Sequence, residues 1–588
     1  MKKTRTFLSI FLLSLLFVNC KPEMKSQDFK SIMDNYFDDK NVLNPLDATQ
    51  SGQNEYNDQL PFEMTDGYRK AQAAFFDKYE AALETIDETQ LSKEDKNSYE
   101  IIKWEVEVGK KLLKQPTNLF PITQFDGTHL TMGQFAGGTS AQPFKTEKDY
   151  SNFLKRLDIY SVWIDSAMVY MKKGIAKGVI LPKELTEKLI PQFEGMPTPK
   201  IEDNLFYSSI KLMPATFSDE TKKDLTAKYT AVINDKLIPQ YQKMTNFLKN
   251  EYLPASRTTS GIGSFPFGKD LYTIYVKQWT TTEMTPDEIH NLGLKEVTRL
   301  NAEMEKIKNQ VGFKGTLKEF FGEVRNKPEL KPFKTPEEVI ANFYKIYARL
   351  KPNVDKLFSL QPKTKFEVRR TEAFREKSAA AQYSPGAADG SRPGIFYVPI
   401  PDITDYNIYR DEDLFLHEAI PGHHFQISLQ QENTSLPDFR KFNWFGAYGE
   451  GWALYTESLG KELGMYQDPY QYFGMLSSEM HRAIRLVVDT GIHSKGWTRE
   501  QAIQYSLDNE AMNKAGIISE IERYMARPGQ ALSYKIGQLK IMELRKKAET
   551  KMGAKFDIKK FHEKVLESGV MPLALMEKKI DNWITESK

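Results

Sequence analysis

The chain has 588 residues, of which 40% are hydrophobic and 27% are charged, as in ordinary globular proteins. A chain of this length can bury a large core without disulfides, and it allows either several domains or one large helical enzyme of one or two lobes. Because 81 basic residues nearly balance 79 acidic ones, leaving a formal charge of +2, no strong field favours nucleic acid or acidic membranes. We therefore expect no nucleic-acid partner.

The N-terminus has the pattern of a secretory signal. A basic start, "MKKTR", precedes the apolar stretch "TFLSIFLLSLLFV", which is shorter than the ~20 residues of a membrane-spanning helix. It ends at Cys20, the only cysteine. An unpaired cysteine here resembles the lipidation site of a bacterial lipoprotein, although an ordinary signal peptide ending near a cysteine is the alternative. We expect residues 1–19 to be the signal peptide, residues 20–27 a tether, and the exported protein to be anchored to the bacterial membrane through lipidated Cys20.

The region 28–255 is predicted to be mostly helical. Apolar residues recur at three- and four-residue steps in the segments 67–86, 147–178 and 227–253. A glycine-rich stretch at 256–268 is a candidate break between this N-terminal helical region and a catalytic region, 256–588. Further along the chain, Thr285 and Asp287 are candidate caps for another helix.

Strand signals are few. The clearest are the segments 365–372 and 394–402, and in the second Pro399 and Pro401 argue against a central position in a sheet. We therefore expect an edge strand beside a cleft, followed by a nearly continuous helical region from 404 to the C-terminus. The predicted fold class is mainly α, with a small strand element close to a histidine-rich motif.

That motif is "HEAIPGHH", residues 417–424. It opens like the His-Glu-x-x-His signature of zinc hydrolases, with His417 as a ligand and Glu418 as general base, but Pro421 stands where the second histidine belongs. A proline followed by a glycine can open a wide turn or π-bulge. Such a turn would bring His423 to the second ligand position, and His424 remains the alternative.

The third ligand is expected to be a carboxylate further along the chain. Glu450 lies between two glycines in "GAYGEGWALYTESLG", and those glycines would let its helix approach the first one closely. Alternatively, Glu450 is an acid favoured by the dipole of a helix N-terminus. Glu457, seven residues later on the same face, is a weaker candidate for the third ligand, or a residue that contacts one of the ligands without binding the metal itself.

Four segments together resemble one family. "HEAIPGHHFQ", "GEGWALYTESLG", "RLVVDTGIHSKGWTREQAI" and "ERYMARPGQALSYKIGQL" look like the bacterial domain-of-unknown-function 885 family, whose members are often lipoproteins. The resemblance covers most of the mature chain and is densest from about 383 to 545. That family is in turn similar to helical gluzincin metallopeptidases. The resemblance implies a large helical fold with a deep cleft, one Zn²⁺ ion per chain and a peptide substrate.

The same resemblance implies a donor for the developing oxyanion and groups that hold the substrate. His493 and Tyr534 are the candidate donors, although His493 could instead cap a helix and Tyr534 could be core. Arg485 and Arg392 are candidates for binding a substrate carboxylate, and Arg485 could instead pair with Asp489. The segment containing Tyr397 is a candidate for pairing with substrate backbone.

The sequence therefore predicts an exported, lipid-anchored zinc metallopeptidase, in which metal-activated water attacks a peptide carbonyl and Glu418 transfers the proton. A metal hydrolase that cuts another amide is the nearest alternative. A non-catalytic helical surface lipoprotein that binds peptides or glycans is a second one. Glu418 separates these classes, because a binding protein has no use for a base beside His417.

Overall fold

The computed structural model describes residues 28–587, except positions 139, 199, 373–375, 377–378, 387–389 and 391. The predicted signal peptide, the tether and Cys20 lie outside the described residues. The described part is mainly α, as the sequence predicts, with one three-stranded sheet.

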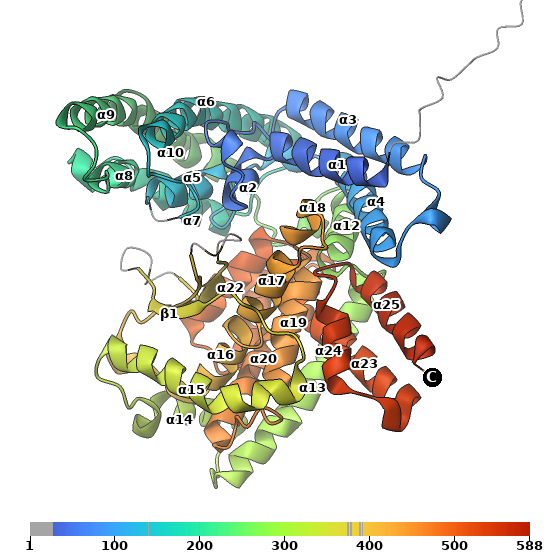
Figure 1. The fold of residues 1–588 in the computed structure, drawn as a ribbon. Helices are drawn as coiled ribbons and strands as arrows, with labels where there is room; N and C mark the ends of the chain where they lie inside the picture. The colour runs from blue at the N-terminus through green and yellow to red at the C-terminus, as the bar shows by residue number, and fades with distance from the viewer. Residues whose placement is uncertain are drawn as a thin grey trace, which may run out of the picture.

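The helices before residue 256 form a layer across one side of the molecule, drawn in blue to green at the top of Figure 1. They are α1 (Phe29–Leu43), α2 (Pro45–Gln50), α3 (Asp66–Leu83), α4 (Lys93–Leu113), α5 (Thr128–Ala136), α6 (Glu147–Lys177), α7 (Lys183–Glu194), α8 (Ser208–Lys211), α9 (Asp219–Val232), α10 (Ile238–Phe247) and α11 (Leu253–Ala255). The predicted segments 67–86 and 147–178 are confirmed as α3 and α6.

The predicted helix at 227–253 is present but is not uniform. It runs from α9 to α11 through two π-helical turns, Ile233–Leu237 and Leu248–Tyr252. Each wide turn contains the residue four positions before a proline, Pro239 or Pro254. A proline ring clashes with that carbonyl in a regular α-helix, so the wider turns let the helix continue beyond Pro239 and include Pro254, one residue before its end at Ala255.

The remaining helices form the larger body below that layer (Figure 1). They are α12 (Gly268–Thr280), α13 (Pro286–Gln310), α14 (Leu317–Asn326), α15 (Pro336–Leu357), α16 (Asp411–Glu418), α17 (His423–Glu432), α18 (Asp438–Lys441), α19 (Gly446–Ser458), α20 (Pro469–His493), α21 (Arg499–Asn509), α22 (Lys514–Ala526), α23 (Ser533–Met552), α24 (Ile558–Leu566) and α25 (Leu573–Glu586). Helix α13 begins at the predicted cap, because the Thr285 side chain accepts from the Glu288 backbone N–H.

Helix α20 is the central support of this body. Almost every residue from Phe473 to His493 is buried, and α20 contacts α13, α16, α19, α21, α22 and α23. A helix that is covered all round is a rigid base, so side chains that project from it are held in fixed positions.

The sheet has the order β1-β3-β2, with β1 (Phe366–Arg370), β2 (Gln382–Ser384) and β3 (Gly394–Val398). The prediction that 394–402 forms an edge strand is wrong. β3 is the central strand, parallel to β1 and antiparallel to β2. The two prolines are compatible with this position, because the strand ends at Val398 and neither proline takes part in its hydrogen-bond ladder.

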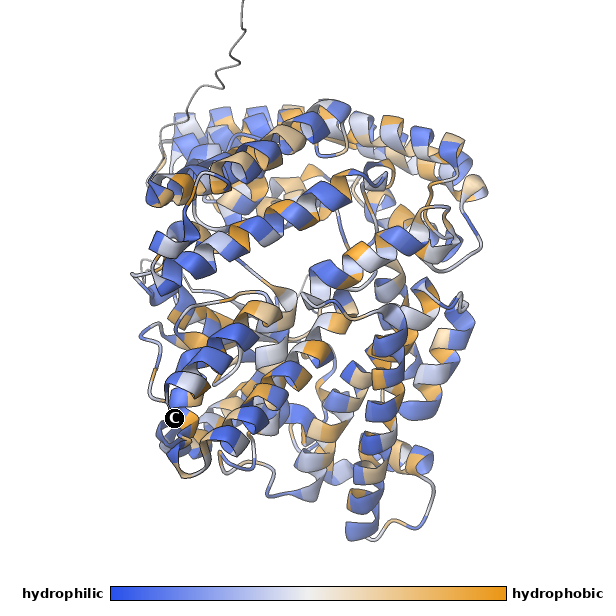
Figure 2. Ribbon diagram, turned by 90° about the vertical axis from the view of Figure 1, so that its right-hand side faces the viewer, coloured by the Kyte–Doolittle hydropathy of each residue, from blue (hydrophilic) through white to orange (hydrophobic). Residues whose placement is uncertain are grey.

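Hydrophilic and hydrophobic residues alternate along most helices (Figure 2), as expected where one helix face is packed and the other is solvated. Among the described residues, none of the helices combines the length and the apolar character that crossing a bilayer requires.

Candidate metal centre

The histidine motif folds as two short helices with a break between them. Helix α16 ends at Glu418, Ala419 leaves the helical region with φ −108° and ψ −99°, and α17 begins at His423. The predicted wide turn or π-bulge is therefore wrong in detail: the helix stops and restarts. Gly422 makes the sharp turn possible, because a Cβ atom there would lie 1.9 Å from the carbonyl oxygen of His417.

Helix α19 holds both sides of this break. The indole Nε1–H of Trp452 donates to the carbonyl oxygen of Pro421 at 2.8 Å, and the hydroxyl of Thr456 donates to that of Leu416 at 3.0 Å. Carbonyls at a helix end have no partner in the helix. These bonds satisfy two carbonyls beside the break and fix the angle at which α17 leaves α16.

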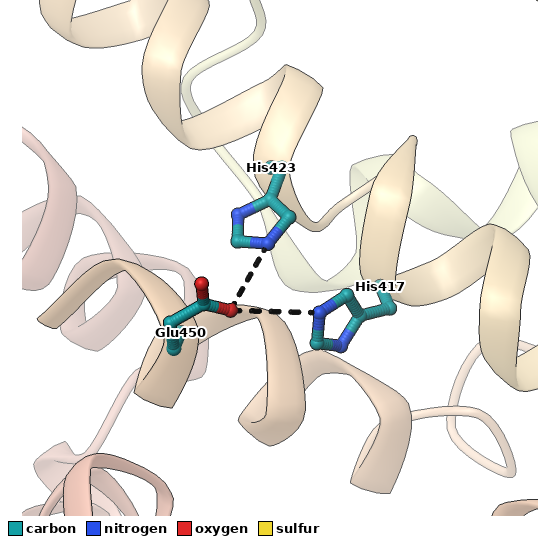
Figure 3. Close-up of side chains that lie close together, drawn as sticks. All are labelled: His417, His423 and Glu450. Atoms are coloured by element: carbon teal, nitrogen blue, oxygen red, sulfur yellow. Dashed lines mark ion pairs between the residues drawn. The ribbon is translucent and has the colours of Figure 1, made fainter. Parts of the chain in front are cut away.

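Three side chains converge across the break (Figure 3). The Oε2 atom of Glu450, on α19, lies 3.8 Å from Nε2 of His417 and 3.4 Å from Nε2 of His423. The two imidazole rings are perpendicular, with centroids 4.8 Å apart. One ligand atom from each residue lies within 4.8 Å of the others, so the three residues form a buried cluster of the kind that can hold a metal ion.

His424 lies outside this cluster. Its Nδ1 is 3.0 Å from the hydroxyl of Tyr383 on β2, and its ring lies 5.2 Å from that of Phe366 on β1. Burial lowers its pKa to about 4. Of the two alternatives for the second ligand position, the structure therefore brings His423 to Glu450 and uses His424 to join α17 to the sheet.

Glu457 supports His417 from behind. Its Oε1 lies 2.7 Å from Nδ1 of His417, which leaves Nε2 directed at Glu450. Burial alone would lower the pKa of His417, but Glu450 and Glu457 outweigh it and raise the pKa to about 9. Burial alone would raise the pKa of Glu450, but His417 and His423 hold it well below its usual range. The bare cluster is thus held together by opposite charges.

Glu418 is buried beside the cluster. Burial raises its pKa, and nearby His417 and His423 partly offset the shift. None of the described residues forms a hydrogen bond with its carboxylate, which therefore remains available to accept a proton.

Tyr534 reaches the site because α19 and α23 pack backbone to backbone. A Cβ atom on Gly451 would lie 2.4 Å from Cα of Gly537, so the glycine after Glu450 serves the approach of α23. The sequence predicted that the glycines bring α19 close to the first histidine helix, whereas Gly451 instead brings α19 close to α23. Burial raises the pKa of Tyr534, and the negative charge of Glu450 adds to this.

His493 is not brought to the cluster, so its prediction as an oxyanion donor is corrected. Its Nδ1 accepts from the backbone N–H of Ile262 at 3.1 Å, and its Nε2 lies 3.0 Å from the carbonyl oxygen of Tyr524. Burial lowers its pKa to about 3. Both ring nitrogens are used for packing the 256–268 stretch and α22 against the end of α20.

The predicted substrate-binding residues lie in different settings. Arg485 is buried, with its guanidinium bonded to the hydroxyl of Tyr524 and the carboxylate of Glu520, both at 2.9 Å, so its charge already has a partner. Arg392 is exposed just before β3, and Tyr397 is half-buried on that strand. Since β1 and β2 occupy both edges of β3, this strand cannot pair with substrate backbone.

A cavity of about 810 Å³ lies between the N-terminal layer and the larger body. Aromatic side chains contribute much of its lining, which includes Tyr68, Trp104, Tyr275, Trp279, Trp444 and Phe445. Trp444 connects it to the cluster, because its ring centroid is 5.9 Å from that of His423. One lining residue of the cavity is therefore in ring contact with a histidine of the cluster.

The family model for bacterial proteins of unknown function named DUF885 matches residues 45–580, most of the chain. The chain belongs to the DUF885 family. A crystal structure of a "putative lipoprotein" from Colwellia psychrerythraea is similar, with a TM-score of 0.88 and 28% identity, covering 95% of this chain and 99% of that one.

A second solved structure shares the fold of this DUF885 protein. It is a "putative lipoprotein of unknown function" from Shewanella oneidensis, with a TM-score of 0.72 and 20% identity, covering 94% of this chain and 99% of that one. A search of curated proteins finds no significant match.

Sequence reasoning missed two residues near the site, Trp444 and Arg482. Trp444 is 41% exposed although it is a large aromatic residue, but only the fold reveals what it faces. Arg482 precedes Arg485 by one helical turn, so a search for further cations on the same face would have found it. Its guanidinium lies 5.9 Å from the ring centroid of Tyr534. The N-terminal residues of the cavity carry no sequence signal.

Proposed function

We propose that this protein is a zinc-dependent peptide hydrolase. The observation that carries the proposal is the convergence of two imidazole nitrogens and one carboxylate oxygen next to the buried carboxylate of Glu418. A binding protein needs neither a set of metal-ligand types nor a base beside it.

The three side chains fit zinc. Zinc takes nitrogen and oxygen ligands at about 2 Å in a tetrahedral arrangement, which corresponds to about 3.3 Å between ligand atoms. The separations of 3.4 and 3.8 Å to Glu450 are close to that value. Glu457 would keep His417 in the tautomer that presents Nε2, a usual arrangement around metal-binding histidines. When bound, zinc supplies Lewis acidity, which polarises a carbonyl group and makes water more acidic.

Glu418 would then transfer the proton. Its raised pKa, and a carboxylate that accepts no hydrogen bond from a described residue, suit a group that takes a proton from the attacking water and passes it to the leaving amine. The C–N bond breaks, the water oxygen stays on the former carbonyl carbon, and the amine leaves with the proton. The hydroxyl of Tyr534 would donate to the carbonyl oxygen as it gains negative charge.

The aromatic cavity supports a peptide as the substrate. Its volume of about 810 Å³ is within the range of ligand sites, and such sites are mostly apolar and aromatic. Trp444, one of its lining residues, lies beside His423, with the ring centroids 5.9 Å apart. An amide in a modified or cyclic peptide would satisfy the same chemistry, so the proposal covers amide hydrolysis with peptides as the main class.

We further propose that the protein is exported and lipid-anchored through Cys20. The basic and apolar N-terminal pattern ending at the only cysteine supports this, as do the descriptions of the two similar structures as lipoproteins. The mainly helical fold and the spacing of the candidate ligands are in keeping with a gluzincin-like peptidase.

The proposal is tested with Glu418→Gln, His417→Ala and the control Glu543→Gln, whose carboxylate pairs with Lys540 on the surface of α23. We expect wild type and Glu543→Gln to bind one zinc ion per chain and to cleave a random peptide library. Glu418→Gln should keep the metal and lose cleavage, and His417→Ala should lose both. Unchanged cleavage by Glu418→Gln would refute the mechanism, and a wild type that binds no zinc would refute the metal site.

A further inference from the structure

Arg482 is a cation beside the site, and no described residue provides it with an anionic partner. It lies on α20, and its one hydrogen bond within the described structure runs from Nη1 to the carbonyl oxygen of Ser478 at 3.3 Å. No carboxylate of the described residues lies within ion-pair distance of its guanidinium. Its Nε atom is buried without a partner, while the side chain as a whole is partly exposed.

The neighbours of Arg482 on α20 locate it between the elements that carry Glu418 and Tyr534. One turn before it, the hydroxyl of Ser478 donates to Asp413 of α16 at 2.5 Å. One turn after it, the guanidinium of Arg485 lies 4.5 Å from the ring centroid of Tyr534 on α23. The guanidinium of Arg482 itself lies 5.9 Å from that ring centroid, and α20 also contacts α16 and α19, so Arg482 lies beside Tyr534 where these helices meet.

Arg485 has an ion-pair partner among the described residues and Arg482 does not. Arg485 stands one turn away on the same face, but Glu520 and Tyr524 bind it directly. Burial lowers the pKa of Arg482, and the more distant carboxylate of Glu457 offsets this only in part. A partly desolvated guanidinium is costly unless an anion pairs with it. A ligand that brings its own carboxylate would remove this cost.

We propose that Arg482 binds the C-terminal carboxylate of the peptide, and that the enzyme therefore cuts near the C-terminal end of its substrates. This inference rests on the proposed peptidase function and assigns its polarity. A guanidinium and a carboxylate form two parallel charge-assisted hydrogen bonds. With the carboxylate on Arg482, the last peptide bonds of the chain lie within reach of Tyr534 and Glu418, and the products are a shortened peptide and a short C-terminal fragment.

The test uses pairs of tetrapeptide libraries with identical composition, ending in either a free carboxylate or a carboxamide. Wild type, Arg482→Gln and Arg482→Lys are compared, each loaded with zinc. The matched control is Arg545→Gln. Arg545 lies on α23, eleven residues or about 16 Å beyond Tyr534, and it pairs there with Glu462. Cleavage rates, cleavage positions and bound zinc are measured for each protein.

We expect wild type and Arg545→Gln to cleave free acids about 100-fold faster than amides. Arg482→Gln should lose that preference, because it should cleave the free acids more slowly and the amides at the wild-type rate, with zinc content unchanged. Arg482→Lys should recover part of the preference. Equal loss on acids and amides would overturn the inference, because Arg482 would then act on Glu418 or the oxyanion. A preference that follows Asp and Glu side chains inside amidated peptides would also overturn it, by assigning the guanidinium to acidic side chains.

These outcomes are distinct from a failure of the proposed function. If wild type binds zinc and cleaves acids and amides alike, the peptidase proposal stands and the assignment of Arg482 falls. If wild type cleaves neither library, the peptidase proposal falls and the assignment falls with it.

Discussion

Two regions of the molecule meet prolines inside helical sequence and respond in opposite ways. From α9 to α11 the chain widens into π-helical turns before Pro239 and Pro254, so the helix continues beyond Pro239 and reaches Ala255, one residue after Pro254. At Pro421 the chain stops the helix and starts another, with His423 as its first residue. The first region keeps one helix face against the core, whereas the second turns a histidine toward Glu450.

The difference depends on what lies next to each proline. Pro239 lies between ordinary helical residues, and Pro254 follows such residues one position before the helix ends at Ala255, so a local widening removes the clash. Pro421 is followed by Gly422, which fits directly against the end of α16, and Trp452 binds the proline carbonyl from α19. A proline alone therefore does not determine a break. The break needs a glycine that can approach the preceding helix and a neighbouring helix that holds it.

The largest effect is expected from Gly422→Ala, which should abolish the break. The new Cβ would lie 1.9 Å from the His417 carbonyl, so the turn must open and His423 must move away from Glu450. We expect a loss of about 3 kcal/mol in unfolding free energy and at least a 100-fold loss in zinc affinity, measured by thermal denaturation and chelator competition. Gly322→Ala in α14, where a Cβ meets nothing within 4 Å, should change neither by much. An intact zinc site in Gly422→Ala would show that the break tolerates a side chain.

The neighbouring histidines should separate metal binding from stability. His423→Ala removes a proposed ligand, so we expect zinc affinity to fall by a factor of about 100 or more. His424→Ala removes contacts with Tyr383 and Phe366, so it should lower the unfolding free energy by about 2 kcal/mol and leave zinc bound. Equilibrium dialysis and denaturant titration measure the two quantities. The opposite result would assign the second ligand position to His424.

Glu457→Gln is expected to weaken the site without removing a ligand. The carboxylate that orients His417 from 2.7 Å would be replaced by a neutral group, and such changes behind a metal-binding histidine reduce affinity by about 10- to 100-fold. Zinc affinity is measured beside Glu462→Gln, whose carboxylate pairs with Arg545 away from the cluster. Equal affinity in both variants would show that His417 needs no support from behind.

The two proline-containing regions also begin differently, and this difference predicts a pH dependence. Helix α9 begins with the exposed Asp219 and Glu220, whereas α16 begins with Asp411, whose pKa burial raises to about 8. An acid whose folded pKa exceeds its unfolded value of 3.8 stabilises the fold below that value, and this contribution is lost as pH rises to about 8. We expect wild type to lose up to about 1.4 kcal/mol per pH unit across this window relative to Asp411→Asn. Parallel pH profiles of the two unfolding free energies would contradict this.

The smallest effect is expected at the tolerated prolines. Pro239→Ala restores a backbone donor and removes the ring that the π-helical turn accommodates, so the turn can tighten without moving a buried face. We expect the unfolding free energy to change by less than about 1 kcal/mol and zinc binding to stay the same. A large loss of stability would show that the wide turn is required by packing and is not a response to the proline.

Much of the fold could be predicted from the sequence. The three- and four-residue recurrence of apolar residues is a local pattern, and it correctly identified α3, α6 and α13, including the Thr285 cap. The strand at 366–370 was also predicted from a local signal, the strand-like segment 365–372. β2 was missed because three residues are too few to show a period, and β3 was assigned to an edge because its prolines were counted inside a strand that ends before them.

For the site, the sequence by itself determined the residue types: His417, Glu418, two adjacent histidines and Glu450 within a recognisable family pattern. Only the tertiary structure decided which histidine faces Glu450, because that choice depends on the contacts of Gly422 and Trp452 with elements distant in the chain. It also decided that His493 and Arg485 already have partners, while Arg482 has no anionic partner among the described residues. Partners, burial and uncompensated charge are properties of neighbours in space, and a linear pattern does not record them.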